Sequence, residues 1–340
     1  MIDFRYHLVS IVAVFLALAI GIVLGSTELQ GPVYNALNHT TSALENQLGN
    51  ADNQRDTAQQ GLSADNAMLA SSEAWTVRGM LDGQRVVVFT EPGYQQSVIT
   101  GVETALKDAG ATVTGQINLQ QKFFDSSNQT AASLEATNAQ IASSDQISLN
   151  GGLSDQQQAT AQVIATEVLT KSPSGAGIQA ASNSQSTQAQ TALEAYATQN
   201  FLTSSGQPST QATLAVVVTP QTSLSDGTAD PLAQVLGPFA QELANVSSGT
   251  VVAGSAAASG AGSPIAELRA TSVASHVSSV DDADTVRGQI SVVSALYATL
   301  TGGPAGSYGI NSGSYPALSP TDTPSPSSTP SSTPSRKPHK

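Results

Sequence analysis

Residues 8–24 form an uncharged, predominantly apolar run close to the N-terminus, and no second run of this kind occurs in the chain. At about 1.5 Å per residue, an α-helix of this length spans roughly 26 Å, which approaches the thickness of the hydrocarbon core of a bilayer. The aromatic and basic side chains of residues 4–7 can extend the run into the interface. The sequence therefore predicts a single transmembrane helix, with residues 1–28 as an N-terminal anchor in the lipid bilayer.

A cleavable signal peptide is the alternative interpretation of this run. Its apolar segment is shorter, about 7–15 residues, and ends at an A-x-A-like cleavage site. Residues 25–28 (GSTE) are a poor cleavage site, so we predict an uncleaved anchor. Arg5 precedes the run, and no further Lys or Arg occurs before Arg55. The positive-inside rule then predicts a cytoplasmic N-terminus and an extracytoplasmic remainder, without deciding between an inner and an outer membrane.

Small residues recur every four positions in the apolar run, at Ala13, Ala17, Gly21 and Gly25. We call these four residues the small-residue stripe. Because they lie on one helical face, they would let two helix backbones approach closely. The stripe predicts self-association in the membrane, although Ala and Gly are also common in membrane helices that do not associate.

Composition excludes several classes of partner and site. The formal net charge is −13, and charged residues make up only 11% of the 340 residues. An acidic chain poor in Arg lacks the positive charge needed to bind along a phosphate backbone, so we expect no nucleic-acid partner. The chain has no cysteine, which excludes disulfides, thiolate metal sites, iron–sulfur clusters and a cysteine nucleophile.

Residues 29–74 are polar and are predicted to continue the membrane helix outward as a stalk. Spacings of four and three alternate along what we call the heptad seam: Leu44, Leu48, Ala51, Arg55, Ala58, Leu62, Asp65 and Leu69. This pattern predicts a coiled coil, weakened by the charges of Arg55 and Asp65. A solitary amphipathic helix packed on the globular part is the competing interpretation. A parallel homo-oligomer fits both the seam and the small-residue stripe.

The globular part is predicted to be a mostly parallel α/β domain over residues 75–302. Residues 85–90 (RVVVFT) form a continuous apolar strand of the kind that is buried on both faces of a parallel sheet. A helix predicted at 97–108 and a strand predicted at 111–118 complete a β-α-β unit with this first strand. Further strands are predicted at 214–219, 250–253 and 277–280, and further helices at 231–245 and 283–300.

A helical insertion is predicted at about residues 123–211, where Gln, Ser, Thr and Ala dominate. Helices are expected at 153–170 and 188–199, and a buried strand near 146–149. Residues 303–340 are predicted to form a disordered tail rich in Gly, Pro, Ser and Thr. This tail could reach into a cell wall, carry O-linked sugars or remain a bare solvated segment.

Signals of enzymatic chemistry are weak, and we predict that the protein is not an enzyme. The P-loop, H-E-x-x-H and G-x-S-x-G motifs are absent. His276 is the only histidine in the predicted globular domain, so a Ser-His-Asp triad would depend on it. An ordinary surface histidine is the preferred interpretation, and no catalytic or cofactor-binding residue is assigned.

Two further segments could form sites. Residues 254–264 are rich in Gly and follow a predicted strand, but their spacing is not G-x-G-x-x-G, which favours a flexible loop. Asp281, Asp282 and Asp284 could hold a hard cation. We prefer the interpretation that they cap the following helix, because acidic side chains favour a helix N-terminus.

Three separated segments together carry a family resemblance. They are the FRYH motif at 4–7 with the apolar run that follows it, the strand segment LDGQRVVVF at 81–89, and a C-terminal block with SVDDADTV at 279–286 and GSYG at 306–309. The chain resembles the actinobacterial copper transport protein B family over nearly its whole length. The resemblance implies a cell-envelope membrane protein of metal homeostasis that acts in copper efflux and resistance, with the copper ion as the transported species.

The resemblance assigns no copper ligands, and the residues themselves offer few. Cu(I) prefers soft sulfur ligands, and the chain has only Met1, Met68 and Met80. One membrane helix cannot form a channel alone, and no ladder of alternating strands predicts an outer-membrane barrel. A pore would therefore require an oligomer. The alternative function is a non-enzymatic structural or adaptor protein that binds an envelope partner protein.

Overall fold

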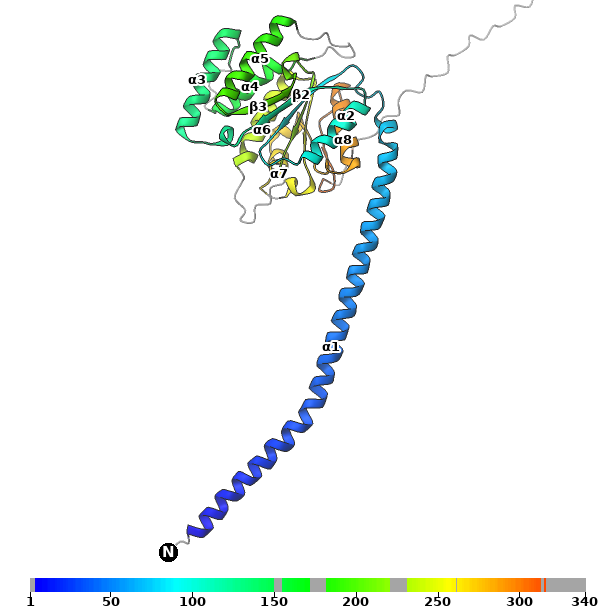
Figure 1. Ribbon diagram of the computed structural model, residues 1–340, viewed down its shortest axis with the longest axis vertical. Coiled ribbons are helices and arrows are strands. Elements are labelled where there is room, and N and C mark those ends of the chain that lie inside the picture. The colour runs from blue at the N-terminus through cyan, green and yellow to red at the C-terminus, as the bar shows by residue number, and fades with distance from the viewer. Residues whose placement is uncertain are drawn as a thin grey trace, which may run out of the picture. The chain divides into compact units, whose positions relative to one another are not determined.

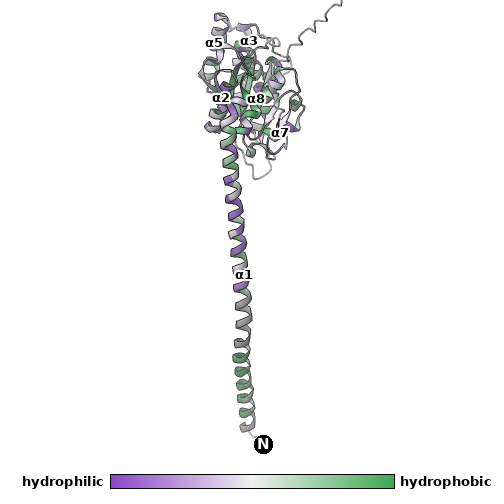
Figure 2. Cartoon of the chain, turned by 90° about the vertical axis from the view of Figure 1, so that its right-hand side faces the viewer, coloured by the Kyte–Doolittle hydropathy of each residue, from purple (hydrophilic) through white to green (hydrophobic). Residues whose placement is uncertain are grey.

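The computed structural model describes residues 4–149, 155–171, 182–220, 231–260, 262–312 and 315 (Figure 1). The chain divides into two compact units, Met1–Asp65 and Asn66–Lys340. Helix α1 (Phe4–Val77) forms the described part of the first unit and continues into the second. Among the described residues, one segment, Tyr6–Gly25, is long and apolar enough to cross a membrane. Figure 2 shows the hydrophobic turns near the N-terminal end of α1.

A seven-stranded sheet forms the centre of the second unit. The strands are β1 (Arg85–Thr90), β2 (Thr112–Leu119), β3 (Leu202–Gly206), β4 (Leu214–Val218), β5 (Gly249–Ala253), β6 (Ser278–Val280) and β7 (Ser307–Tyr308). Their order in the sheet is β3-β2-β1-β4-β5-β6-β7. Every pair of neighbours is parallel except β2 and β3, which pair in antiparallel fashion. The predicted α/β class with a mostly parallel sheet is confirmed.

Helices cover both faces of the sheet. α2 (Gln96–Asp108) and α8 (Val286–Leu300) lie together on one face (Figure 1). The opposite face carries α3 (Asn128–Asp145), α4 (Gln156–Val168), α5 (Asn183–Thr198), α6 (Pro231–Val246) and α7 (Pro264–Ala270). Each face has its own hydrophobic core, because alternate residues of a strand point to opposite sides.

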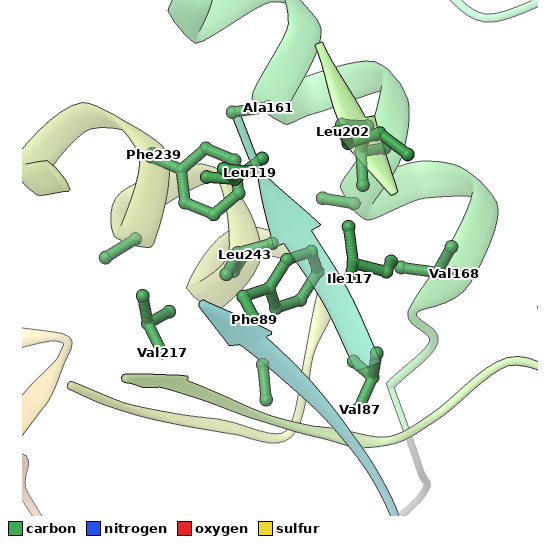
Figure 3. Packing of buried hydrophobic residues seen from close by; sticks show 14 of the residues in the cluster. Val87, Phe89, Ile117, Leu119, Ala161, Val168, Leu202, Val217, Phe239 and Leu243 are labelled. Atoms are coloured by element: carbon green, nitrogen blue, oxygen red, sulfur yellow. The ribbon is translucent and has the colours of Figure 1, made fainter. Parts of the chain in front are cut away.

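The central strands show why the sequence forms this architecture. Val86 and Val88 of β1 pack in the core under α2 and α8, whereas Val87 and Phe89 pack in the core on the α6 face. The second of these cores is shown in Figure 3, where Phe89, Leu119 and Phe239 come together from β1, β2 and α6. Phe89 and Phe239 make an edge-to-face contact with ring centroids 5.5 Å apart. A strand that is buried on both faces therefore needs the continuous apolar run that residues 85–90 provide.

The middle of the chain corrects one prediction. No strand forms near residues 146–149; α3 ends there instead, with Gln146 in the left-handed conformation at φ 56°. The Ile147 N–H returns to the carbonyl of Ala142 at 2.9 Å, and the Ile147 side chain packs against the core. The local apolar residues thus close a helix rather than start a strand. The edge strand of this region is β3, which was not predicted.

The C-terminal part of the sheet also extends beyond the expected helix end at residue 300. Ser307–Tyr308 form β7 and pair with β6 in residues that the sequence analysis assigned to the tail. Asn311 continues this segment, and its side-chain amide donates to the carbonyl of Ala256 at 2.9 Å. Most of the predicted disordered tail, from residue 316 onward, lies outside the described residues.

Candidate functional site

The topology of the sheet changes direction between β1 and β4. β1 leads to α2 on one face, whereas its neighbour β4 is followed in the chain by α6 on the other face. In open α/β sheets, ligands bind outside the carboxyl ends of the strands at such a switch point. This edge of the sheet is therefore the first place to search for a site.

Polar residues follow the strands at this carboxyl edge. The register places Glu91 after β1 beside Thr219 after β4, because Thr90 pairs with Val218. The Glu91 N–H donates to the carbonyl of Val218 at 3.1 Å, and the Glu91 side chain is 1% exposed. The hydroxyls of Thr219 and of Ser255, which follows β5, are also buried, and neither has a hydrogen-bond partner among the described residues. The edge of the sheet is thus lined by buried polar groups.

Arg269 of α7 ties together the ends of the last two strands. Its guanidinium donates to the carboxylate of Asp281 at 2.7 Å, to the hydroxyl of Ser279 at 2.9 Å and to the carbonyl of Tyr308 at 2.8 Å. Asp281 is fully buried, and its other oxygen accepts from the Asn311 N–H. The three contacts join α7, β6 and β7, so this ion pair holds the C-terminal strand in place.

The neighbouring Asp282 forms a second buried ion pair. Its carboxylate accepts from Arg287 Nε at 3.1 Å and from the Tyr315 hydroxyl at 3.2 Å. The Arg287 guanidinium also lies over the Tyr315 ring, 4.8 Å from its centroid. Burial raises the pKa of the Asp284 carboxyl, and the carboxylates of Asp282 and Asp281 raise it further.

The preferred interpretation of the acidic cluster was wrong. The N-cap of α8 is Thr285, whose hydroxyl accepts from the Gly288 N–H, and none of the three aspartates has this role. The alternative of a cation site is not supported either, because the described residues contain no group of three or more His, Cys, Asp or Glu that could hold a metal ion. Two of the aspartates instead pair with arginines: Asp282 with Arg287, five residues further along the chain, and Asp281 with Arg269 of α7.

The segment after β5 is ordered where it is described, not a free loop. Residues Ala256–Ser259 form a short 3₁₀ turn, and α7 begins at Pro264. The Gly254 N–H donates to the carbonyl of Val280, and the Gly254 carbonyl accepts from the Ala283 N–H, both at 2.9 Å. A Cβ at position 254 would lie 2.6 Å from the Thr219 hydroxyl oxygen. The glycine therefore allows close packing of the strand ends.

His276 lies on the opposite, amino edge of the sheet. Its Nδ1 is 2.9 Å from the Ser275 hydroxyl, and the side chain is exposed at a pocket of about 330 Å³ that Lys171 and Asn245 also line. No carboxylate lines this pocket, so the described residues do not place an acid beside His276 for a triad.

A larger pocket, of about 620 Å³, opens where α3, α4 and α6 begin. We call it the glutamine pocket, and its lining consists of Phe124, Ser126, Ala131, Asp155, Gln156, Gln157, Gln234 and Val235. Phe124 and Val235 belong to the core on the α6 face. No motif in the sequence predicted this pocket, because its residues come from three separate segments. The only available signal was the amide-rich composition of the middle of the chain.

In the part of the chain that the structure describes, the glycines of the small-residue stripe and three leucines of the heptad seam have no packing partner. No heavy atom lies within 4 Å of a Cβ built at Gly21 or Gly25. Leu44, Leu48 and Leu62 of the seam are 54–65% exposed. The stripe and the seam from Leu44 to Asp65 lie in the first unit, and self-association through them remains a prediction.

Comparisons with known proteins agree with the resemblance drawn from the sequence. The family model described as "Copper transport outer membrane protein, MctB" matches residues 1–318. The protein "Copper transporter MctB" of Mycobacterium tuberculosis (strain ATCC 25618 / H37Rv) is 29% identical over 315 residues, which cover 92% of this chain and 98% of that protein. The corresponding Mycobacterium bovis protein gives the same values. The Mycobacterium leprae protein of the same name is 29% identical over 327 residues, with the same coverage.

Proposed function

The chain belongs to the family of copper transport outer membrane proteins typified by MctB, and on this premise we propose that it lowers cellular copper as a homo-oligomer anchored in the envelope. The family is one of transporters and not a known enzyme family. The observation that carries the oligomer is that one unit holds both a membrane-length apolar helix and the exposed seam leucines Leu44, Leu48 and Leu62.

The membrane segment requires an oligomer if copper passes through it. A single helix satisfies its own backbone hydrogen bonds but encloses no path, so a pore needs several helices around it. The open space over Gly21 and Gly25 would let neighbouring helices approach closely along the small-residue stripe. An assembly of this kind could conduct ions where one chain could not.

The heptad seam would hold such an assembly in parallel. Leu44, Leu48 and Leu62 expose between half and two thirds of their surface, and pairing with a second copy would bury them. Because the seam and the membrane segment belong to one helix, and all of the seam except Leu69 lies in the same unit as the membrane segment, a parallel seam would bring the membrane segments of two chains together. Arg55 and Asp65 interrupt the seam, which favours an assembly of modest stability.

Copper need not bind tightly within one subunit. Of the thioethers in the described residues, Met80 is buried at 6% exposure and Met68 lies alone on α1 at 72% exposure. No metal-binding group of three or more His, Cys, Asp or Glu occurs among the described residues. A transport path needs only weak sites from which the ion can leave, so the proposal predicts no stoichiometric copper in the purified chain.

Copper content of cells tests the transport proposal directly. A deletion strain should accumulate more cell-associated copper and grow poorly under copper stress, and the wild-type gene should restore both. Ala17→Leu, which fills the small-residue stripe, should fail to restore them. Ala19→Leu is the matched control, since position 19 lies on the other side of the helix at 100° per residue. Unchanged copper content in the deletion strain would refute copper efflux and favour the adaptor function.

Cysteine crosslinking tests the oligomer separately, because the chain has no cysteine of its own. Ala51→Cys, on the seam, should form disulfide-linked dimers in membranes under mild oxidation. Asn53→Cys, off the seam, should not. Equal crosslinking at both positions, or none at either, would refute the parallel seam. Protease digestion of spheroplasts then tests the proposed topology, in which the second unit is extracytoplasmic and accessible.

The adaptor function remains the second candidate, and one observation favours it. The second unit holds a pocket and a polar carboxyl edge but no group of copper ligands among its described residues. If reconstituted full-length protein conducts neither copper nor other ions while the deletion strain still accumulates copper, transport belongs to a partner that this protein supports.

A further inference from the structure

The glutamine pocket has no role in the copper proposal and does not depend on it. We propose that this pocket binds a neutral, hydroxyl-rich ligand of the size of one or two sugar rings. Its volume of about 620 Å³ lies within the range of about 300–1,000 Å³ that is typical of small-molecule sites. Its lining includes residues of the segments that follow β2 (Phe124 and Ser126) and β4 (Gln234 and Val235) in the chain, on the α6 face. Segments that follow the carboxyl ends of parallel strands are where this class of sheet binds ligands.

Free amide groups provide the hydrogen-bonding capacity. The side chains of Gln157 and Gln234 both line the pocket, and neither forms a side-chain hydrogen bond within the described part of the chain. Each primary amide can donate two hydrogen bonds and accept others. Asp155 caps α4 by accepting from the Gln157 N–H at 2.9 Å through one carboxylate oxygen, and no described residue donates to its other oxygen. A ligand hydroxyl, which both donates and accepts, matches this mixture of groups.

The charge of the lining excludes anionic ligands. No Lys, Arg or His lines the pocket, whereas the Asp155 carboxylate does. A phosphate or carboxylate ligand would therefore meet the Asp155 carboxylate with no positive side chain in the lining to pair with it. The single carboxylate of the lining is also too few for a metal site.

Apolar groups would contact the C–H faces of a sugar ring. Phe124, Ala131 and Val235 contribute the apolar part of the lining. Phe124 stacks edge-to-face on Phe123, with centroids 5.2 Å apart, and Phe123 packs in turn on Phe239 at 6.1 Å. This aromatic row anchors one wall of the pocket in the core, so the wall is rigid before a ligand arrives. Preorganisation of this kind lowers the entropic cost of binding.

Saturation-transfer NMR on the full-length protein in detergent tests the proposal with defined probes. Maltose, N,N′-diacetylchitobiose and maltohexaose are presented at millimolar concentration, with glucose 6-phosphate and triserine as comparison ligands. If only the disaccharides bind, the ligand of the glutamine pocket is a free sugar. If maltohexaose binds equally well, the ligand is a segment of a glycan chain. Either result supports the proposal.

Two variants on adjacent residues of α3 locate the binding. Ala131→Trp fills the pocket, whereas Ala132→Trp places the same side chain on the exposed surface next to it. Ala131→Trp and the double variant Gln157→Ala/Gln234→Ala should each weaken binding about tenfold or more, or about 1.4 kcal/mol. Ala132→Trp should bind as the wild type does.

Three results would overturn the proposal. The first is the absence of a signal from every sugar with a wild-type protein whose circular dichroism shows it folded. The second is undiminished binding in both Ala131→Trp and the double glutamine variant. The third is stronger binding of glucose 6-phosphate or triserine than of any neutral sugar, which would assign the pocket to an anion or a peptide.

Discussion

Replacing Arg269 with methionine should strongly destabilise the second unit. Methionine keeps much of the aliphatic length of the side chain but removes the charge, so Asp281 is left fully buried without a counter-charge. The substitution also removes the two donors to Ser279 and to the carbonyl of Tyr308, which join α7 to β6 and β7. Breaking a buried ion pair by removing one partner costs about 3–5 kcal/mol. We expect a loss of this size in the free energy of unfolding.

Urea unfolding of the full-length protein in detergent, followed by circular dichroism, measures this loss. Arg287→Met is the matched control. Arg287 pairs with the equally buried Asp282, but its side chain is 44% exposed and makes a single hydrogen bond at 3.1 Å, and Tyr315 also donates to Asp282. Arg287→Met should therefore lower the free energy of unfolding by less than Arg269→Met does.

A double-mutant cycle isolates the charge from the packing. Asp281→Asn in the Arg269→Met background removes the uncompensated charge and should recover part of the lost stability. The reasoning is refuted if Arg269→Met costs less than about 1 kcal/mol, or if it costs no more than Arg287→Met.

Further outcomes follow from other sites. Burial raises the pKa of Glu167 to about 7, so the folded state binds this proton more tightly than the unfolded state does, and the carboxyl lowers stability as pH rises from about 4.5 through 7. In urea titrations, the stability of Glu167→Gln relative to the wild type should therefore increase by about 1–2 kcal/mol between pH 5 and pH 8. A stability difference that stays constant with pH would contradict this. Gly288→Ala should destabilise by more than about 2 kcal/mol, because its Cβ would collide with the carbonyl of Asp282. Gly237→Ala, in open space on α6, should stabilise by up to about 1 kcal/mol, and the reverse order of the two glycine variants would refute the packing argument. Arg55→Leu should raise the oligomer population in analytical ultracentrifugation if the heptad seam pairs, and an unchanged distribution would count against the seam.

The strongest predictions from the sequence concern segments whose pattern is local. The apolar run of residues 8–24 predicts a membrane-length helix whatever follows it, and the described helix Tyr6–Gly25 agrees. The run RVVVFT at 85–90 predicts a strand buried on both faces, and Val86 to Phe89 have no exposed surface. In both cases the decisive property is the period and length of the apolar residues, which the chain carries by itself.

The sequence was less informative where a segment is held by distant residues. Residues 146–149 contain the alternation of a strand, yet Gln146 closes α3 and Ile147 turns into the core. The edge strand β3 is polar over Ser204 and Ser205, and it exists because β2 offers it an antiparallel partner. Pairing of this kind depends on which strand edge is free, and no local pattern records that.

The candidate site divides in the same way. The sequence located an acidic cluster at 281–284 and a glycine-rich segment after a strand, both at the carboxyl edge of the sheet. Only the tertiary structure places Arg269 of α7 against Asp281, which directly follows β6. Asp281 therefore forms a buried ion pair and not the predicted helix cap. The tertiary structure also assembled the glutamine pocket from the starts of three helices. A membrane anchor depends on the solvation of consecutive residues, whereas a pocket depends on contacts between segments that are far apart in the chain, and those are decided by the packing of the whole domain.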